Sequence, residues 1–551
     1  MRDPAATPVA ELRAAVEAAA GALGDGGSPR SRPTLERPKQ AAHGDYATNA
    51  ALLLAPVVGS PPREVADRLG GALREALGRR LDRVEVAGPG FLNLFLADAW
   101  YTRALDWVLD AGEGFGGGTA PVAERVLLEF VSANPTGPLT AASGRHAAYG
   151  DALARILAFV GHEVSREYYF NDAGSQIDNL GRSIRARARG EEPPEDGYLG
   201  DYVSELAAAI TDAADADVGA LAARGVELLL AGIKATLAAF RVEFDTFFSE
   251  ASLHEGYPNA IERANALLAD RGHTYRSDGA LWLRTTTFGD DKDRVLERSN
   301  GEPTYFGRDV AYHENKLERG FERLVNPLGA DHHGYVARLR AALAALGADP
   351  DRLEAPLLQF VHIVEEGARA SMSKRRGEFV TLDDLIAEIG VDATRFFMLQ
   401  RSHDSTVALD LRLAREQSAE NPVFYVQYAH ARIASVRRKA GEERVARALA
   451  APAGEVTLHP SERELVKKLL AFPDEASEAA VRRAPHRIAA YALELAQVFT
   501  AFYRDCLVVG AEPEALETWR LRLSVAAQRT IARALDLLGV EAPAEMERDQ
   551  P

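Results

Sequence analysis

The chain has 551 residues, of which 47% are hydrophobic and 26% charged, a composition that supports several buried cores and predicts about three or four domains. A single cysteine, Cys506, excludes a disulfide framework, and no uninterrupted apolar stretch has the length of a membrane helix. The N-terminal residues read as an acidic amphipathic helix and lack a secretory h-region. The formal net charge of −17 argues against a basic coat over the whole surface, so phosphate binding would use local basic patches. We therefore expect a globular, cytoplasmic protein.

Residues 1–110 predict a small N-terminal α/β domain. A leading helix is followed by a polar turn, a helix rich in Arg and Ala, and an alternating segment over residues 84–97 that is typical of a half-buried strand. Tyr46 and Asn49 lie in the polar turn, where capping and orienting a helix is a sufficient reason for such residues.

Glycine recurs between residues 112 and 118. A phosphate-binding loop follows a strand and opens a helix, whereas this segment follows a helix-like stretch and precedes a strand. We therefore expect residues 111–118 to stop a helix and to form a flexible linker at a domain boundary.

Residues 126–161 predict an apolar strand, a tight turn and a long helix that starts near Leu139. The free N–H groups and the positive dipole end of such a helix lie beside the carboxyl edge of the strand, where doubly wound sheets bind phosphorylated ligands. An ordinary strand-turn-helix crossover has the same pattern, so spacing alone does not decide between the two. The turn-forming residues are Asn134, Pro135, Gly137 and Pro138.

Residues 119–400 predict a nucleotide-binding fold of the Rossmann type that is interrupted by an insertion over about residues 180–300. After a strand at 162–170, Asn171 or Asp172 is available as a helix N-cap. Mostly helical sequence then leads to successive strands, with turns at residues 277–279 and 300–301.

Two polar groups further along this zone have ordinary explanations. Asp309 stands where a helix over residues 310–319 would need an N-cap, and Gly320 would close that helix. His332 and His333 follow an aspartate, but consecutive side chains diverge and no third ligand has a suitable spacing, so we expect no protein-held metal.

Residues 401–551 show helical periodicity throughout and predict an all-α bundle. Tyr425, Tyr428 and Arg432 lie on one face of a predicted helix, and Arg437 begins a basic run. Aromatic rings beside cations suit unstacked RNA bases and phosphates, although a tyrosine stripe is more often part of a core.

Four segments in this order resemble the arginyl-tRNA synthetases, a class I family. The segments are "EFVSANPTGPL" at 129–139, "PTYFGRDVAYHENKLERGF" at 303–321, "ASMSKRRGEFVTLDDLIAEIG" at 370–390 and "NPVFYVQYAHARI" at 421–433. The resemblance extends from residue 38 to about residue 543. It implies a class I Rossmann catalytic domain, an N-terminal domain that contacts the tRNA elbow and a C-terminal anticodon-binding domain. It also implies ATP-dependent ligation of arginine to tRNA(Arg) through an arginyl-adenylate, with ATP entering as its Mg²⁺ complex; we further expect a monomer.

The resemblance assigns roles to individual positions. Tyr305 and Asp309 match residues that face the guanidinium of arginine, and a carboxylate can accept two parallel N–H bonds from that planar group. Glu129 interrupts an apolar strand, so it needs a cationic or hydrogen-bonding partner such as a bound arginine, unless it faces water on an edge strand. The implied arginine-binding residues are Glu129, Asn134, Tyr305, Asp309, His332 and His333. The implied ATP-binding residues are Pro138, Thr140, Ser143, Met372, Ser373 and Lys374, of which Lys374 would follow the pyrophosphate as charge shifts onto it. The implied tRNA-binding residues are Tyr46, Asn49, Tyr425, Tyr428, Arg432 and Arg437.

The chain departs from the family at the first ATP signature. The His-x-Gly-His tetrad is replaced by residues 140–143, Thr-Ala-Ala-Ser, so both imidazoles are missing. We hypothesise that Thr140, Ser143 and His146, which lies three residues further along the helix, share the phosphate-stabilising work. A catalytically silent homologue that binds tRNA without charging it is the alternative, and a nucleotidyltransferase for another small cation is a third possibility. The chain retains the implied arginine-binding residues and Lys374, which favours an active enzyme.

Overall fold

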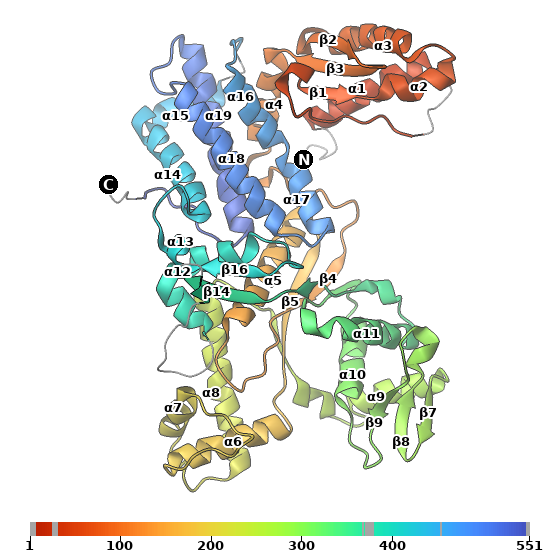
Figure 1. Ribbon diagram of the computed structural model, residues 1–551, viewed down its shortest axis with the longest axis vertical. Coiled ribbons are helices and arrows are strands. Elements are labelled where there is room, and N and C mark those ends of the chain that lie inside the picture. The colour runs from red at the N-terminus through yellow and green to blue at the C-terminus, as the bar shows by residue number, and fades with distance from the viewer. Residues whose placement is uncertain (1–6, 25–30, 366–367, 370–379, 452–453, 547–551) are drawn as a thin grey trace.

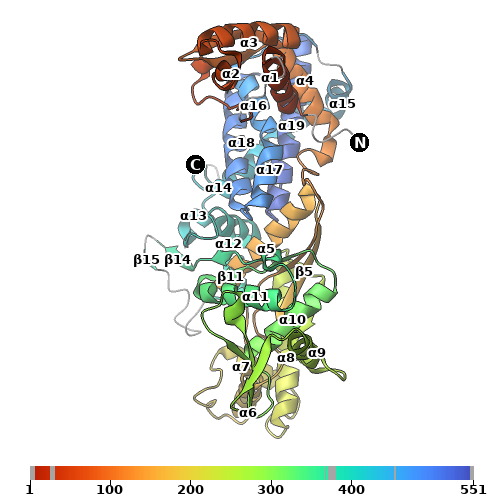
Figure 2. The ribbon, with the colours of Figure 1, turned by 90° about the vertical axis from the view of Figure 1, so that its right-hand side faces the viewer.

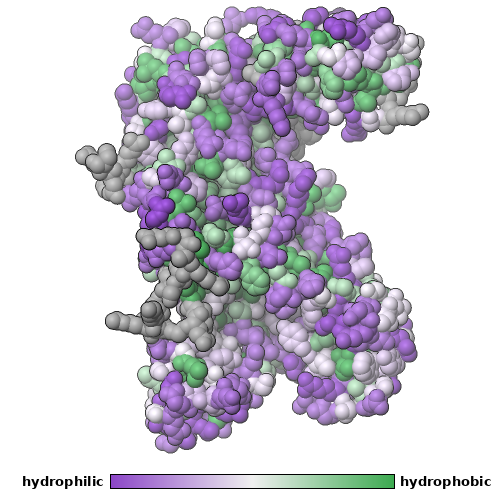
Figure 3. Space-filling model, viewed as in Figure 1, coloured by the Kyte–Doolittle hydropathy of each residue, from purple (hydrophilic) through white to green (hydrophobic). Residues whose placement is uncertain are grey.

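The computed structural model describes residues 7–24, 31–365, 368–369, 380–451 and 454–546. The molecule is elongated, with a small N-terminal domain at one end beside a helical bundle formed by C-terminal residues (Figure 1). A parallel sheet lies in the middle, and two lobes project from it at the opposite end (Figure 1, Figure 2). Figure 3 shows that one side of the surface is hollowed between the N-terminal domain and one of these lobes.

The N-terminal domain is a three-stranded antiparallel sheet covered by helices, as the sequence predicts. The segment expected to be a single strand is a hairpin, because Gly88 and Gly90 adopt φ values of 53° and 147° and reverse the chain. The elements are α1 (Pro8–Leu23), β1 (Tyr46–Thr48), α2 (Ala50–Val58), α3 (Pro62–Leu77), β2 (Leu81–Ala87), β3 (Phe91–Leu96) and α4 (Asp98–Asp110).

The glycine-rich segment ends α4 as predicted, but the expectation that it is a flexible linker is wrong. The Phe115 side chain is 5% exposed and packs against Trp107 and Phe472. A Cβ atom on Gly116 would lie 2.6 Å from the Phe472 ring, and one on Gly117 would lie 2.8 Å from the Phe159 carbonyl oxygen. Glycine is used here because the backbone passes close to its neighbours, which holds the segment in place.

The central sheet consists of five parallel strands, namely β4 (Arg125–Glu129), β5 (Glu163–Phe170), β6 (Thr246–Ser249), β10 (Arg323–Val325) and β12 (Leu353–Glu354). Their order across the sheet is β12-β10-β4-β5-β6. The first strand in sequence is therefore central, and the chain adds strands first on one side and then on the other. This topology confirms the predicted Rossmann-type core and places a switch point between β4 and β10, where such sheets bind ligands.

The predicted insertion is two segments, because β6 lies inside the expected range and belongs to the main sheet. The first segment forms one projecting lobe with its own hydrophobic cluster, and the second forms the other lobe. Asp278 and Gly279 have positive φ values of 51° and 80°, so the predicted hairpin turn is confirmed. The elements are α6 (Ser175–Ala188), α7 (Asp201–Ala209) and α8 (Val218–Ala239), then α9 (Ala260–Asp270), β7 (Thr274–Ser277), β8 (Ala280–Leu283) and β9 (Arg294–Glu297).

Two predicted helix caps are wrong. Neither Asn171 nor Asp172 caps α6, because Asp172 accepts hydrogen bonds from the Ser249 hydroxyl and the Ala251 N–H, and Gly174 takes the N-cap position. Asp309 does not cap a helix either. Helix α10 (Tyr305–Glu318) begins five residues earlier than predicted, after Thr304, whose Oγ1 accepts the Gly307 N–H at 3.1 Å. Asp309 is therefore an interior residue of α10.

The remaining strands lie close to the central sheet. β11 (Leu328–Gly329) pairs with β13 (Leu357–Leu358), and α11 (His333–Ala345) follows β11. β14 (Val361–Glu365) pairs with β15 (Ala368–Arg369) and with β16 (Val407–Asp410). Because β16 is a strand, the prediction that residues 401–551 are wholly helical is wrong at this point.

The C-terminal bundle lies next to β14, β16 and α12 (Leu382–Leu399), as Figure 1 shows. Its apolar residues join those of the central sheet and the N-terminal domain in one hydrophobic cluster. Within the described ranges no helix is both long and apolar enough to cross a membrane. The helices are α12, which precedes the bundle, and α13 (Leu411–Arg415), α14 (Pro422–Ala440), α15 (Glu442–Ala450), α16 (Pro460–Leu470), α17 (Phe472–Val481), α18 (His486–Asp505) and α19 (Glu514–Leu537).

Candidate active site

The switch point between β4 and β10 carries Glu129. Lys316 of α10 lies with its Nζ atom 2.5 Å from Glu129 Oε2, and Asn326, which follows β10, donates to the same oxygen at 3.1 Å. The side chain of Lys316 is 0% exposed and that of Glu129 is 14% exposed. The edge-strand explanation for Glu129 is wrong because β4 is an interior strand, and its cationic partner within the chain is Lys316.

A second buried carboxylate lies next to it on β5. Glu167 binds both terminal nitrogens of Arg319, at 2.5 and 2.8 Å, and accepts a hydrogen bond from the Tyr312 hydroxyl at 2.6 Å. The paired layer, which we define as Glu129, Glu167, Lys316, Arg319 and Asn326, thus matches each buried carboxylate with one cation.

Asp309 lies on the same helix but has a different environment. Its exposed fraction is 9%, and its Oδ2 accepts a hydrogen bond from the Tyr335 hydroxyl of α11. Burial raises the pKa of Asp309 to about 7, and the charges of Glu129 and Glu250 act in the same direction, whereas the Tyr335 hydrogen bond opposes the shift. The carboxylate is therefore only partly ionised at neutral pH, and a bound cation would stabilise its ionised form. We call Asp309, Tyr335 and the exposed Tyr305 the Asp309 group.

The turn after β4 has a strained backbone. Val131 and Ser132 adopt φ values of 66° and 45°, a left-handed region that is costly for a β-branched residue. The Ser132 side chain holds the turn in place, because its Oγ donates to Glu129 Oε1 and accepts the Tyr169 N–H, both at 3.1 Å. Strain of this kind concentrates at functional sites, and here it directs the chain from the sheet towards α5 (Ala141–Val160).

Thr140 and Ser143 lie at the amino end of α5. Thr140 is the N-cap, and its Oγ1 accepts the Ser143 N–H at 3.3 Å and lies 3.2 Å from Ser143 Oγ. The helix thus starts two residues after the predicted position. Both side chains are partly exposed, so hydroxyl groups and free helix N–H groups are present together at this end of α5.

Two backbone hydrogen bonds join the start of α5 to the start of α12. The Ala141 N–H donates to the Val380 carbonyl at 3.0 Å, and the Leu382 N–H donates to the Leu139 carbonyl at 2.8 Å. Thr381, which lies between Val380 and Leu382, caps α12 in a capping box with Asp384. Val380 and Thr381 are therefore held beside the amino end of α5. Met372, Ser373 and Lys374 themselves lie outside the described residues.

His146 lies three residues after Ser143 on α5. Burial lowers the pKa of His146 to about 4, with a further contribution from Arg145, so the ring is neutral at pH 7. Asp331 and His332 are near enough to influence this pKa, which places the start of α5 near the turn before α11. His332 and His333 are exposed, and His332 Nε2 lies 3.5 Å from Asp331 Oδ2. Across the described ranges, no group of three or more His, Cys, Asp or Glu residues is arranged to hold a metal ion.

The N-terminal candidates for tRNA contact have structural partners. The Tyr46 side chain is 7% exposed and packs edge-on against Trp100, with ring centroids 6.1 Å apart. Asn49 accepts the Thr34 N–H at 2.9 Å and makes no side-chain cap bond to α2. Both residues thus have structural partners, although the Asn49 side chain does not cap α2, and their role in tRNA binding stays a prediction.

On α14 the aromatic and cationic candidates lie together. Tyr425 packs against the main hydrophobic cluster, whereas the Arg432 guanidinium lies over the rings of Tyr428 and Tyr503, at 4.7 and 5.1 Å from their centroids. Arg437 is exposed and donates to Gln528 Oε1 at 2.7 Å. The core explanation thus fits Tyr425 best, while Tyr428 and Arg432 form a partly exposed aromatic-cation pair.

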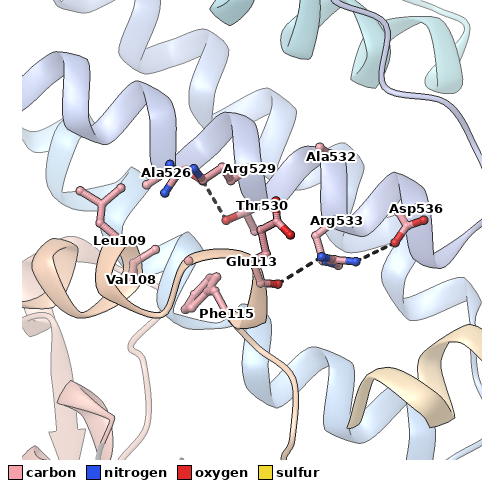
Figure 4. A pocket seen from close by; sticks show the side chains of 11 residues that line it. Val108, Leu109, Glu113, Phe115, Ala526, Arg529, Thr530, Ala532, Arg533 and Asp536 are labelled. Carbon is pink, nitrogen blue, oxygen red and sulfur yellow. Dashed lines mark hydrogen bonds and ion pairs between the residues drawn. The ribbon is translucent and has the colours of Figure 1, made fainter. Parts of the chain in front are cut away.

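Two cavities lie away from this site. One, of about 280 Å³, is enclosed by the glycine-rich segment, the end of α4 and α19, and Figure 4 shows Phe115 and Arg533 on its walls. The other, of about 450 Å³, lies between α9 and the β7–β9 sheet and includes Glu262 and Tyr275. Neither contains a residue of the ATP signatures or of the Asp309 group.

Several residues of the site escaped the sequence analysis, namely Lys316, Arg319, Asn326 and Tyr335. Lys316 of α10 and Arg319, the C-cap of that helix, follow Asp309 at spacings of seven and ten residues, so a stripe of polar residues at helical spacing was the available signal. It was missed because polar residues of a helix are normally assigned to its solvent face.

The comparisons with known proteins first define the class. Residues 226–435 match the family model "tRNA synthetases class I (R), catalytic domain". Residues 10–96 match "Arginyl tRNA synthetase N terminal domain", and residues 426–546 match "DALR anticodon binding domain". The chain is thus built as a class I synthetase, with its Rossmann core between an N-terminal domain and a helical C-terminal domain.

Similar full-length proteins define the family. The arginine–tRNA ligase of Frankia alni is 47% identical over 98% of this chain and 100% of its own length, and that of Geobacillus thermodenitrificans is 44% identical over 93% and 94%. The structure of Thermus thermophilus arginyl-tRNA synthetase has a TM-score of 0.73 and 27% identity, covering 97% of this chain and 100% of its own. The chain belongs to the arginyl-tRNA synthetase family.

Proposed function

We propose that this protein ligates L-arginine to tRNA(Arg) in two steps. The arginine carboxylate attacks the α-phosphate of ATP, which forms arginyl-adenylate and releases pyrophosphate. The arginyl group then passes to the terminal adenosine of the tRNA, with release of AMP. The observation that carries this proposal is the likeness of nearly the whole chain, at 44–47% identity, to proteins named arginine–tRNA ligases.

The Asp309 group is the proposed site for the guanidinium of arginine. Asp309 is buried, and the two cations of the paired layer bind Glu129 and Glu167 instead of Asp309. Its carboxylate can accept two parallel N–H bonds from a planar guanidinium. We assign the hydroxyl of Tyr305 to the same end of the substrate. Glu129 and Asn134 would hold the amino-acid end, and His332 and His333 line the approach from the turn before α11.

The amino end of α5 is the proposed site for the ATP phosphates. Pro138 ends the turn before α5, and Thr140, Ser143 and His146 supply uncharged hydrogen-bonding groups beside the positive end of the helix dipole. We also assign Met372, Ser373 and Lys374 to ATP binding, and Mg²⁺ would enter bound to the nucleotide. A neutral His146 acts in this scheme as a hydrogen-bond donor and not as a cation.

We assign tRNA binding to both ends of the chain. The N-terminal domain, with Tyr46 and Asn49 in its turn, would contact the tRNA elbow. The face of α14 with Tyr425, Tyr428, Arg432 and Arg437 would contact the anticodon arm. The hollowed side in Figure 3 runs along the molecule beside the N-terminal domain and gives an RNA an extended surface. We expect the protein to act in the cytoplasm as a monomer.

Arginine-dependent exchange of pyrophosphate into ATP, measured with and without tRNA, tests the proposal. We expect exchange with arginine, together with transfer of labelled arginine to tRNA(Arg). The variant Lys374→Met should lower the exchange rate by about 10²-fold or more, because it removes a cation that we assign to the transition state. Purified protein that binds tRNA but does not charge it would contradict the proposal. Pyrophosphate exchange that requires a different small cation in place of arginine would show that arginine is not the substrate.

A further inference from the structure

The first ATP-signature turn is held by the helical lobe of residues 175–239. The turn, residues 133–138, contains two prolines and has few hydrogen bonds of its own, apart from the Thr136 N–H to the Asn134 carbonyl at 2.8 Å. Tyr202, on α7, donates its hydroxyl to the Thr136 carbonyl at 2.7 Å. Asn134 Nδ2 donates to Gln176 Oε1, on α6, at 2.8 Å. Two helices of the lobe thus contact the turn that sets the start of α5.

The sheet supports the same turn from the other side. The Tyr168 hydroxyl, on β5, donates to the Ala133 carbonyl at 2.7 Å. Because Tyr168 belongs to the main sheet, its contact is part of the nucleotide fold. The contacts of Tyr202 and Gln176 come instead from a segment inserted between β5 and β6, and they serve the turn at long range in sequence.

The lobe also contacts the second ATP signature. Thr236, on α8, donates its hydroxyl to Asp383 Oδ2 in the first turn of α12 at 2.9 Å. Asp383 lies two residues after Thr381, which is the N-cap of α12. One lobe therefore touches both segments that the ATP phosphates would meet.

The lobe is rigid enough to position what it touches. Its own core includes Leu180, Ile184 and Val203, each 0% exposed. Helices α6 and α8 approach closely at two glycines: a Cβ on Gly181 would lie 2.3 Å from the Val218 carbonyl oxygen, and one on Gly225 would lie 2.6 Å from Ile184 Cδ1. Close packing of this kind transmits position from one end of a unit to the other.

We propose that this lobe is a brace that sets the first signature turn for ATP, with Tyr202 as its positioning residue. The inference rests on the proposed function, because it concerns the nucleotide site of that reaction. Tyr202 does not touch the reacting atoms in this role. It fixes the Thr136 carbonyl and, through residues 137–139, the place where the hydroxyls and N–H groups of the α5 amino end meet the phosphates.

The variant Tyr202→Phe removes one hydroxyl and keeps the ring in the lobe. We expect the KM for ATP in pyrophosphate exchange to rise about fivefold, as loss of one hydrogen bond predicts, with kcat and the KM for arginine within about twofold of the wild type. Tyr198→Phe is the matched control, because Tyr198 lies in the same lobe and uses its backbone N–H, 2.9 Å from Ser183 Oγ, for its hydrogen bond. The control should leave the KM for ATP unchanged.

Calorimetric titration with Mg-ATP alone measures the same effect without chemistry. Tyr202→Phe should raise the Kd about fivefold relative to wild type and Tyr198→Phe, with the same midpoint of thermal unfolding in all three proteins. An unchanged Kd overturns the brace, as does an equal loss of every parameter in step with the folded fraction. A wild-type protein that binds Mg-ATP but exchanges no pyrophosphate would contradict the proposed function and leave this titration to decide the brace.

Discussion

The paired layer and the Asp309 group meet at α10, which carries both Lys316 and Asp309, yet their carboxylates are matched differently. In the paired layer, Glu129 has Lys316 and Glu167 has Arg319, so each buried charge is met inside the chain. Asp309 has the hydroxyl of Tyr335 as its hydrogen-bond donor, and burial raises its pKa to about 7. A buried carboxylate with its own cation stabilises the fold as a unit, whereas one without a cation is prepared to bind a cation from outside.

The largest expected effect tests the paired layer. Lys316→Met leaves Glu129 without its cation, and removal of one partner from a buried pair costs about 3 kcal/mol or more. We expect hydrogen exchange of the α10 and β4 amides to become faster by an amount that corresponds to this loss. The double variant Glu129→Gln/Lys316→Met leaves no unpaired charge and should recover most of the protection. A double variant as unprotected as the single one would show that the pair has no structural role.

The Asp309 group is tested by Asp309→Asn, which keeps the volume of the side chain and removes its charge. The KM for arginine should rise at least about 30-fold, because loss of one partner of a buried charged pair costs about 2 kcal/mol or more, while the KM for ATP stays the same. The fold should not be weakened, since the buried carboxylate is itself costly. Steady-state kinetics and thermal unfolding check both statements. An equal rise in the two KM values would place Asp309 outside the arginine site.

The pH dependence of arginine binding sharpens the same comparison. With a pKa of about 7, Asp309 is about one tenth ionised at pH 6 and about nine tenths ionised at pH 8. The cationic substrate binds the ionised form, so the KM for arginine should fall about tenfold as the pH rises over this range, and proton release on binding should be measurable by calorimetry near pH 7. The effect on folding has the opposite sign. The folded-state pKa lies above the unfolded value, so the stability from this group is full below about pH 4 and is lost as the pH rises through 7. A KM for arginine that does not change with pH would contradict the assignment.

The smallest expected effect concerns His146, which lies outside both groups. His146→Ala should slow adenylate formation about fivefold, the value of one neutral hydrogen bond, because Thr140 and Ser143 remain at the helix end. With its pKa lowered to about 4, the ring is neutral throughout the range from pH 6 to pH 8, so the ratio of variant to wild-type rate should not vary with pH there. Single-turnover measurement of adenylate checks the rate. An unchanged rate rejects the role that we assign to His146.

Local sequence predicted the elements that depend on neighbours along the chain. The strand before residue 130, the turn of residues 134–138 and the helix that follows are confirmed. The Asp309 cap failed for a local reason: Thr304 is also a good N-cap, and choosing it lengthens α10 by five residues. Both choices satisfy the same capping rule, so only packing on the sheet decides between them.

The family and the Rossmann core could be predicted from the sequence, because short motifs and hydrophobic periodicity indicate them. The residues assigned to the arginine and ATP sites stay predictions from the resemblance. Tertiary structure alone decided which charges are paired. Lys316 and Glu129 are 187 residues apart, Tyr202 and Thr136 are 66 apart, and the Thr140–Thr381 bridge joins the two signatures across an even longer stretch. Such contacts depend on the crossing of β4, β10 and α10 and on the placement of an inserted lobe, and no pattern of neighbouring residues records where those elements meet.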